Sequence, residues 1–285
     1  MNDDQENAIR NISDTVLWVA IYRARESERP DAHFHDPYAR RLAGTRGEKI
    51  AADMHKKMSI DWPMISRTVS IDRIVNDAIA NGADLVINLA AGLDSRPYRL
   101  DLPAELKWVE VDLPDMTDYK EKALLNDTPK CKLERVSLDL LDTEARRELF
   151  TRLNGECTRA LIISEGLLVY LAEEDVAGLA TDLAAQPNFR EWVIDLANPP
   201  LLKMMKKTYD TLDKADTSLK FGPAEGPDFF KQFGWTPTET HSALHTAAKL
   251  QRLPFLYRLF AFLPDSQGRN PRSVWGGVVR LARME

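Results

Sequence analysis

The sequence predicts an α/β fold in which helices cover both faces of a mostly parallel, seven-stranded sheet. Five short segments are rich in apolar residues, as is typical of strands buried on both faces of a sheet. They alternate with helical segments, which indicates parallel neighbours. The five strands are expected at 85–89, 108–111, 133–138, 160–164 and 192–196, with helices at 115–125, 143–153 and 173–185 and two further strands at 235–242 and 274–281.

Three segments before the first strand have helical or polar character. Ile9, Ile12, Val16 and Val19 repeat at helical spacing, and Pro30 ends that helix near residue 28. Asp36-Pro37 begins a short helix that is expected to end near Gly44, before a polar stretch through residue 57. A third amphipathic helix is expected over 63–81.

The pattern after residue 200 is less regular. Helices are expected at 201–214 and 245–253, a loop at 221–227, and a short helix from Phe229 that ends at Gly234. An aromatic run lies at 255–262. We interpret it as core, with a substrate pocket as the alternative.

Composition excludes several classes of function. The formal net charge of −6 argues against non-specific nucleic-acid binding, and no apolar run reaches the ~18 residues that span a bilayer. Cys131 and Cys157 form no CxxC pair, so neither a zinc site nor a disulfide framework is expected. We therefore expect a cytoplasmic protein that acts on a small molecule, without a metal, nucleic acid or membrane.

The turn after the first strand has the outline of a nucleoside site. Ala90-Ala91-Gly92 follows the strand, and Asp112 ends the next strand twenty residues after Gly92. The turn has only one of the three glycines that a pyrophosphate requires, and the Asp94 carboxylate would repel one. The turn therefore favours S-adenosylmethionine over NAD, although a βα corner without a ligand remains an alternative.

Acidic and polar residues follow the strands of the predicted sheet. Because parallel strands end at one edge, these residues should converge there and need donors or a cation. An adenosine and an ammonium group would supply those donors, whereas a metal is disfavoured because no histidine joins the set. The set comprises Gly92, Asp94, Asp112, Asp139, Glu165, Asp195 and Asn198.

Several motifs, taken together in order, resemble one family. The chain resembles the leucine carboxyl methyltransferase family of class I S-adenosylmethionine-dependent methyltransferases, and within it the branch that includes the tetracenomycin carboxyl methyltransferase. The resemblance implies a Rossmann-like methyltransferase fold in one domain, with an N-terminal helical lid (1–81), a cofactor-binding core (82–200) and a substrate-side part (201–285). The matching motifs are Tyr22-Arg23-Ala24-Arg25-Glu26, Asp36-Pro37-Tyr38, Arg67, Asn88-Leu89-Ala90-Ala91-Gly92-Leu93-Asp94, Glu110-Val111-Asp112-Leu113-Pro114, Asp139-Leu140 and Glu165-Gly166-Leu167-Leu168-Val169-Tyr170.

The resemblance also implies a role for each cofactor-binding residue. Arg67 would bind the carboxylate of the methionine moiety, and Glu165 its α-ammonium group. Asp112 would bind the ribose hydroxyls, and Asp139 and Leu140 the adenine.

Three residues of the turn, Ala90, Gly92 and Asp94, would line the same cofactor. Gly92 would bring the backbone close to it. Ala90 departs from the family pattern, which has glycine there, and this restricts the approach of the backbone.

The methyl acceptor would lie against a second group of residues. Tyr170 and Arg25 would be the catalytic pair, and Arg23, Arg25, Tyr170 and Asn198 would bind the acceptor. The implied reaction is O-methylation of a small organic acceptor, such as one from polyketide or other secondary metabolism, and it leaves S-adenosylhomocysteine.

We interpret the acceptor as a carboxylate because it is ionised at neutral pH and needs no base. A phenol is the alternative acceptor, but it would need a base that the sequence does not identify. A cofactor-binding protein without activity and an NAD(P)-dependent oxidoreductase are the remaining alternatives.

Overall fold

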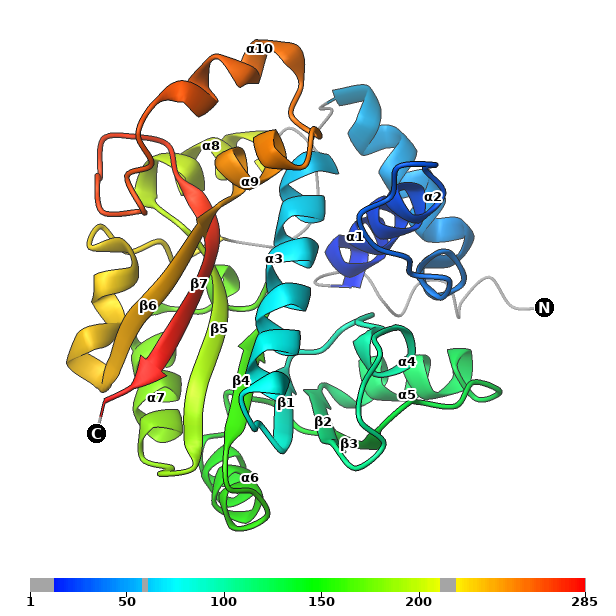
Figure 1. The fold of residues 1–285 in the computed structure, drawn as a ribbon, viewed down its shortest axis with the longest axis vertical. Coiled ribbons are helices and arrows are strands. Elements are labelled where there is room, and N and C mark those ends of the chain that lie inside the picture. Colours follow the sequence, from blue (N-terminus) through cyan, green and yellow to red (C-terminus); the bar gives the residue numbers. More distant parts are fainter. Residues whose placement is uncertain (1–12, 58–60, 211–218, 285) are drawn as a thin grey trace.

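The computed structural model describes residues 13–57, 61–210 and 219–284, and within them the predicted fold class is confirmed (Figure 1). The strands form one seven-stranded sheet in the order β3-β2-β1-β4-β5-β7-β6. Their bounds are β1 Leu85–Leu89, β2 Lys107–Asp112, β3 Lys132–Ser137, β4 Ala160–Ser164, β5 Phe189–Ala197, β6 Trp235–Ser242 and β7 Gly276–Arg283.

The direction of the strands decides where the functional residues gather. β1 pairs in parallel with both β2 and β4, and β4 pairs in parallel with β5. Only β7 runs antiparallel to its neighbours β5 and β6. The carboxyl ends of β1, β2, β4 and β5 therefore lie along one edge of the sheet.

Each face of the sheet is covered by its own helices, which explains why the side chains of the central strand β1 are buried on both faces. Leu85, Ile87 and Leu89 of β1 pack with residues of α6 (Thr143–Gly155) and α7 (Glu173–Ala184). Val86 points the other way and packs with α3 (Asp61–Ala80). Successive side chains of a strand alternate between faces, so both sets have to be apolar.

A third cluster joins the N-terminal helices to the edge of the sheet. α1 (Ser13–Ser27) and α2 (Ala39–Lys57) pack on each other and on Leu93, Tyr98 and Leu124. Leu93 follows the turn after β1, so α1 lies directly on that turn (Figure 1). The predicted contribution of Ile9 and Ile12 to this helix falls outside the described residues.

The first segment of α2 ends at Gly44, as predicted, because this residue leaves helical geometry (φ 61°, ψ −172°). The polar stretch after it was not predicted to be helical, but there the chain resumes the helix and continues to Lys57. Gly47 and Ala51 form its contact face, and a Cβ on Gly47 would lie 3.1 Å from the Leu17 carbonyl oxygen of α1. Small residues permit this close packing. Because glycine and alanine are only weakly hydrophobic, the contact face does not stand out in the sequence and the stretch is classed as polar.

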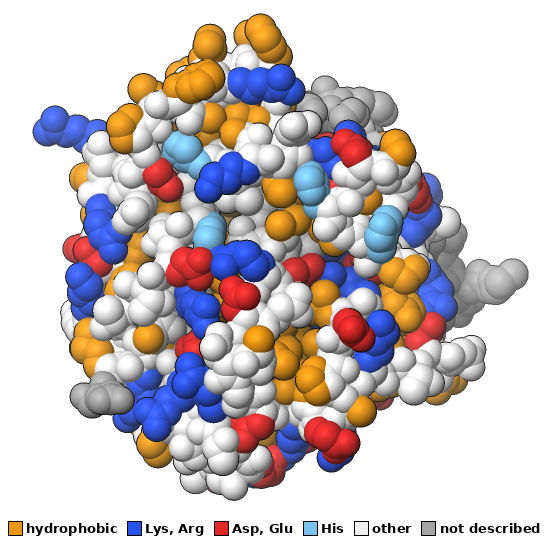
Figure 2. Space-filling model, viewed as in Figure 1, with side chains coloured by type: hydrophobic (Ala, Val, Ile, Leu, Met, Phe, Trp, Pro, Cys, Tyr) orange, Lys and Arg blue, Asp and Glu red, His pale blue; other side chains and the backbone are white. Residues whose placement is uncertain are grey.

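The interpretation of residues 255–262 as core is wrong. These residues form α10 (Phe255–Arg258) and η4 (Phe260–Phe262), and the exposed fractions of Phe255 and Phe262 are 78% and 85%. Figure 2 shows hydrophobic side chains gathered at the end of the molecule that carries α10. Among the described residues no helix is long and apolar enough to cross a membrane.

The remaining helices lie between the strands in the sequence. The sequence-based bounds of α8 and α9 agree with the structure to within a few residues, except that 211–214 lie outside the described residues. The helices are α4 Arg96–Arg99, α5 Pro114–Ala123, η2 Leu168–Tyr170, α8 Pro199–Asp210, η3 Gly226–Phe233 and α9 Ala243–Lys249.

A buried ion-pair network joins β2, β3 and α5. The Glu110 carboxylate accepts hydrogen bonds from Lys120 Nζ at 2.7 Å and from Arg135 Nε at 2.9 Å. Glu110 and Lys120 are almost fully buried. Removing the carboxylate would leave a buried ammonium group without its partner.

We therefore expect Glu110→Ala to lower the free energy of unfolding by about 3–5 kcal/mol, as measured by urea denaturation. Glu105→Ala is the matched control, because the Glu105–Lys132 pair is exposed. Its effect should stay below about 1 kcal/mol. Equal losses for the two variants would show that burial does not govern the contribution of these pairs.

Candidate cofactor-binding site

The turn after β1 has an unusual backbone. Ala90 and Gly92 both have positive φ, at 53° and 47°. The Asp94 N–H donates to the Ala91 carbonyl oxygen at 2.9 Å and closes the turn. A Cβ on Gly92 would lie 3.0 Å from Val16 Cγ1 of α1, so a larger residue there would push the helix away.

Asp112 holds this turn from the neighbouring strand. Its carboxylate accepts hydrogen bonds from the Gly92 N–H at 2.6 Å and from the Leu113 N–H at 2.8 Å. Burial raises the pKa of Asp112 despite those two donors. The structure thus brings together the two residues that the twenty-residue spacing had linked.

A cluster of carboxylates and guanidinium groups occupies the ends of β1, β4 and β5. Nε of Arg67, on α3, is 2.8 Å from Glu165 Oε1, and its Nη1 donates a hydrogen bond to Asp195 Oδ2 at 2.9 Å. The Arg67 side chain therefore reaches the ends of β4 and β5. Gly166 (φ 67°) places its N–H 2.7 Å from Asp195 Oδ1, and a Cβ there would lie 3.6 Å from Arg67 Nη1.

Arg96 is the centre of the same cluster and was not identified from the sequence. Its side chain is buried and donates to Asp72 at 2.6 Å, to Asp94 at 2.7 Å and to Glu165 at 2.8 Å. Arg99 donates twice to Asp72 at 2.7 Å. The signal available in the sequence was the position of Arg96, two residues after the acidic residue of the turn.

The pKa directions follow from these contacts. Burial opposes ionisation of Asp94, but Arg96 and, farther away, Lys120 hold the pKa of this carboxyl well below its usual range. Burial also opposes ionisation of Glu165, and Arg96 and Arg67 together lower its pKa. Both groups are therefore carboxylates at neutral pH.

The charge balance of the cluster favours a cation. Four carboxylates, those of Asp72, Asp94, Glu165 and Asp195, share three guanidinium groups, so one negative charge is left over. The expectation that a ligand supplies most of the donors at this edge is wrong, because arginines of the chain supply them. What remains for a ligand is one cationic group, together with the Nη2 edge of Arg67, for which the described residues provide no hydrogen bond.

Tyr170 lies beside this cluster. Burial raises the pKa of its phenol, although the nearby Thr15 of α1 and the positive charge of Arg67 oppose the rise. The phenol is therefore protonated at neutral pH and can donate a hydrogen bond.

Arg25, the other half of the predicted catalytic pair, is not adjacent to Tyr170. Thr15 and Arg25 are ten residues apart on α1, which is about 15 Å along a helix axis. The guanidinium group of Arg25 lies over the ring of Tyr22, 5.7 Å from its centroid. The Tyr22 hydroxyl is buried and has no hydrogen-bond partner among the described residues.

The two other residues predicted to bind the acceptor are engaged with the chain itself. Arg23 donates to Asp36 at 2.9 Å and to the Leu93 carbonyl oxygen at 2.6 Å. The fully buried amide of Asn198 accepts from the Trp275 N–H at 3.0 Å and donates to the Ser273 carbonyl oxygen at 2.5 Å. In this structure Arg23 holds the turn after β1, and Asn198 holds the segment before β7.

Asp139 and Leu140, predicted to bind the adenine, follow β3. The Asp139 carboxylate accepts from the Leu141 N–H at 2.9 Å, and the Leu140 side chain packs in the core. Neither residue joins the cluster around Arg96. Their place after β3, next to Asp112 at the end of β2, keeps them on the same edge of the sheet.

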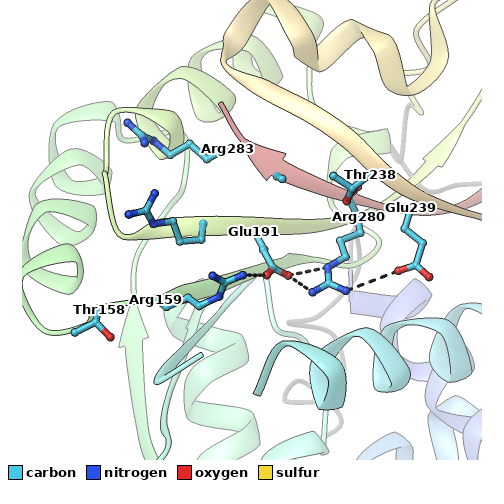
Figure 3. Close-up of a pocket in the computed structure, with 9 residues that line it drawn as sticks. Thr158, Arg159, Glu191, Thr238, Glu239, Arg280 and Arg283 are labelled. Carbon is cyan, nitrogen blue, oxygen red and sulfur yellow. Dashed lines mark hydrogen bonds and ion pairs between the residues drawn. The ribbon is translucent and has the colours of Figure 1, made fainter. Parts of the chain in front are cut away.

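A hollow of about 860 Å³ lies at the opposite edge, where β4 and β5 begin (Figure 3). There Glu191 accepts hydrogen bonds from Arg159 at 2.5 Å and from Arg280 at 2.7 Å. The five residues of β4 separate this hollow from Glu165 by roughly 16 Å. It therefore takes no part in the site at the carboxyl ends.

Comparison with known proteins shows the family to which the chain belongs. A family model for leucine carboxyl methyltransferase matches residues 16–184, more than half of the chain. The match includes the turn after β1, Asp112, Glu165 and Tyr170. The chain belongs to the leucine carboxyl methyltransferase family.

Two relatives named for the same cofactor support this assignment. A protein of Frankia alni, assigned as an S-adenosyl-L-methionine-dependent methyltransferase, is 30% identical over 87% of this chain and 92% of its own length. A Streptomyces avermitilis protein with the same assignment is 30% identical over 65% of this chain and 69% of its own. This methyltransferase therefore uses S-adenosylmethionine, as the turn after β1 predicts.

Solved structures support the fold. A methyltransferase-like protein of Thermobifida fusca superposes with a TM-score of 0.60 over 97% of this chain and 96% of its own, at 14% identity. A DUF574 family protein of Streptomyces avermitilis gives 0.56 over 94% and 97%, at 13% identity. At this level of identity the likeness concerns the fold alone.

The residues at this edge fit S-adenosylmethionine. The uncompensated negative charge suits a sulfonium ion with an α-ammonium group, and the open edge of Arg67 suits a carboxylate. The small residues Ala91 and Gly92 leave space beside the half-buried Asp112 carboxylate.

Ala90 gives a direct test of the turn, because its φ of 53° is unfavourable for any residue with a Cβ. The left-handed conformation costs about 1–2 kcal/mol, and the extra chain entropy of glycine offsets part of the gain. We expect Ala90→Gly to raise the free energy of unfolding by about 0.5–1 kcal/mol in chemical denaturation.

Ala91→Gly is the matched control for this substitution. Ala91 is buried and is not among the residues with positive φ, so glycine should lower the free energy of unfolding by about 1 kcal/mol. A loss of stability in both variants would contradict the assigned strain at Ala90.

Proposed function

We propose that this methyltransferase transfers a methyl group to a carboxylate oxygen of a small organic acceptor, forming a methyl ester and S-adenosylhomocysteine. The observation that supports this proposal most directly is the environment of Tyr170. Its phenol lies beside the Arg67 cluster and its pKa is raised, so it stays protonated at neutral pH and can donate a hydrogen bond to an acceptor.

A carboxylate suits a site of this kind. An ordinary carboxylic acid has a pKa near 4, so its oxygen is already a nucleophile at neutral pH. A phenol, with a pKa near 10, would need a base. The four histidines whose side chains the structure describes hydrogen-bond away from the cluster: His33 to Leu250, His35 to Ser27, His241 to Arg73, and His245 to Leu263.

The residues of the chain would act by binding and orienting. When bound, S-adenosylmethionine supplies a methyl group on a positively charged sulfur. Arg67 would hold its carboxylate, Glu165 its ammonium group and Asp112 its ribose, with Asp139 and Leu140 at the adenine. Alignment of two reactants contributes about 7–11 kcal/mol in favourable cases, so no further chemistry is needed from the protein.

The acceptor would extend from Tyr170 toward the carboxyl end of α1. Arg25 lies about 15 Å along that helix from Thr15, and the Tyr22 hydroxyl and Trp62 Nε1 are buried donors without partners among the described residues. These groups would bind a polar part of the acceptor remote from the reacting carboxylate. Arg23 would act indirectly, by positioning the turn after β1 through Leu93.

We expect Arg67→Ala to weaken S-adenosylhomocysteine binding by at least about 30-fold in calorimetric titration, because truncating one partner of a desolvated charge pair costs roughly 2–5 kcal/mol. Arg73→Ala is the control, since Arg73 lies on the same helix but is partly exposed and pairs with Asp77. The control should bind within about twofold of wild type. Equal affinity in Arg67→Ala and wild type would contradict the role of Arg67.

The proposed acceptor chemistry is tested by the base-lability of the product. The protein is incubated with methyl-labelled S-adenosylmethionine and a panel of small carboxylic acids and phenols, and the products are treated with mild base. A methyl ester releases volatile labelled methanol, whereas an aryl methyl ether keeps its label. Release of methanol is expected, and label retained in a phenol ether would replace the carboxylate with a phenolic acceptor.

A further inference from the structure

The segment 255–263 carries a concentration of exposed apolar side chains. Among the described residues thirteen large hydrophobic side chains are exposed, and seven of them lie in this segment. Phe255, Leu256, Leu259 and Phe262 are all at least 69% exposed. We call residues 255–263 the apolar cap. A contiguous exposed apolar surface of this kind is typical of an interaction site.

The apolar cap is fixed to the body of the protein. Leu253, just before it, is buried. The Leu263 carbonyl oxygen lies 2.9 Å from His245 Nε2 of α9, and the ring of Tyr257 packs 6.1 Å from that of Trp62 at the start of α3. The fold therefore holds these side chains outward at a defined place (Figures 1 and 2).

The charge around the apolar cap is opposite to that of the whole chain. Residues 249–274 contain five basic residues and one acidic residue, a net charge of +4 in a chain of −6. Arg252 and Arg269 pair with carboxylates, whereas Lys249, Arg258 and Arg272 are exposed and have no carboxylate partner among the described residues. The one acidic residue, Asp265, accepts a hydrogen bond from Trp275 Nε1.

We propose that the apolar cap docks on the surface of an anionic lipid bilayer. Aromatic and leucine side chains enter the region between headgroups and acyl chains, while the basic residues face the anionic headgroups. This binding lies in the plane of the interface, so the absence of a spanning segment does not oppose it. A second copy of the chain is a poorer occupant, because a two-fold contact would bring the exposed basic residues Lys249, Arg258 and Arg272 of both copies together.

Docking would set the acceptor side of the molecule against the lipid. The contact between Tyr257 and Trp62 places the apolar cap beside the start of α3, where Trp62 Nε1 and the Tyr22 hydroxyl of α1 lack partners. An acceptor dissolved in the bilayer would then reach the protein without crossing water. Docking itself does not depend on the acceptor proposed above.

The test is flotation of the full chain with vesicles, one set of phosphatidylcholine and one of phosphatidylcholine with phosphatidylglycerol in equal parts. Wild type should float with the anionic vesicles, and less of it in high salt. Replacing Phe255, Phe260 and Phe262 together by serine should lower the bound fraction roughly tenfold or more. Arg258→Glu should weaken binding to the anionic vesicles selectively.

Leu125→Ser is the control, because Leu125 is 80% exposed and lies outside the apolar cap, directly after α5. It should bind like wild type. All substituted side chains are exposed, so unchanged melting temperatures and unchanged S-adenosylhomocysteine affinity will show that each variant is folded. Failure of wild type to float with anionic vesicles, or equal flotation of the triple variant, would overturn the proposal. The proposal would also be overturned if light scattering shows a dimer for wild type and a monomer for the triple variant. That result would assign the apolar cap to self-association.

Discussion

The contacts of Arg96 and Arg67 with the acidic ends of the strands are the constraint on which the site depends. Asp94, Glu165 and Asp195 come from three strands that end at one edge, and without buried cations they would repel one another. Arg96 links α3, the turn after β1 and the end of β4, and Arg67 links α3 to β4 and β5. Burying such groups gains little stability by itself. Its effect is to fix the relative positions of the segments that we propose bind the cofactor.

The N-terminal helices extend the same framework to the far side of the turn. Arg23 donates to the Leu93 carbonyl oxygen, and Val16 lies against Gly92. The turn is therefore held from β2 by Asp112, from within by Arg96 and from α1 by Arg23. This arrangement accounts for an alanine at residue 90 in a left-handed conformation, because the surrounding contacts determine the backbone.

Most of the fold was predictable because hydrophobic periodicity determines it. The strands are rich in apolar residues, and the spacing of Gly92 and Asp112 linked two residues that hydrogen-bond in the structure.

The sequence did not reveal Arg96, because no periodicity distinguishes an arginine that will be buried from an exposed one. Only the fold brings it to its partners on α3, in the turn after β1 and at the end of β4. The second half of α2 was missed because glycine and alanine make its contacts.

The aromatic run 255–262 was misassigned because its hydrophobic residues suggested a buried segment. Hydrophobicity alone does not distinguish a core segment from one that is exposed on the surface. Arg23 and Asn198 were predicted to bind the acceptor, but each forms hydrogen bonds with other parts of the chain. The sequence does not reveal which polar side chains will find their partners within the protein.

One ion pair connects the beginning of the chain to its last quarter. Arg252 donates two hydrogen bonds of 2.9 Å to the carboxylate of Glu26, which is buried on α1 and 226 residues away in the sequence. During synthesis, at about 5–20 residues per second, α1 emerges roughly 10–45 s before this partner. Until then the Glu26 carboxylate has only local partners, the Arg29 guanidinium group 3.8 Å away and the His33 N–H. The full set of contacts of this buried carboxylate on α1 therefore forms only late in synthesis.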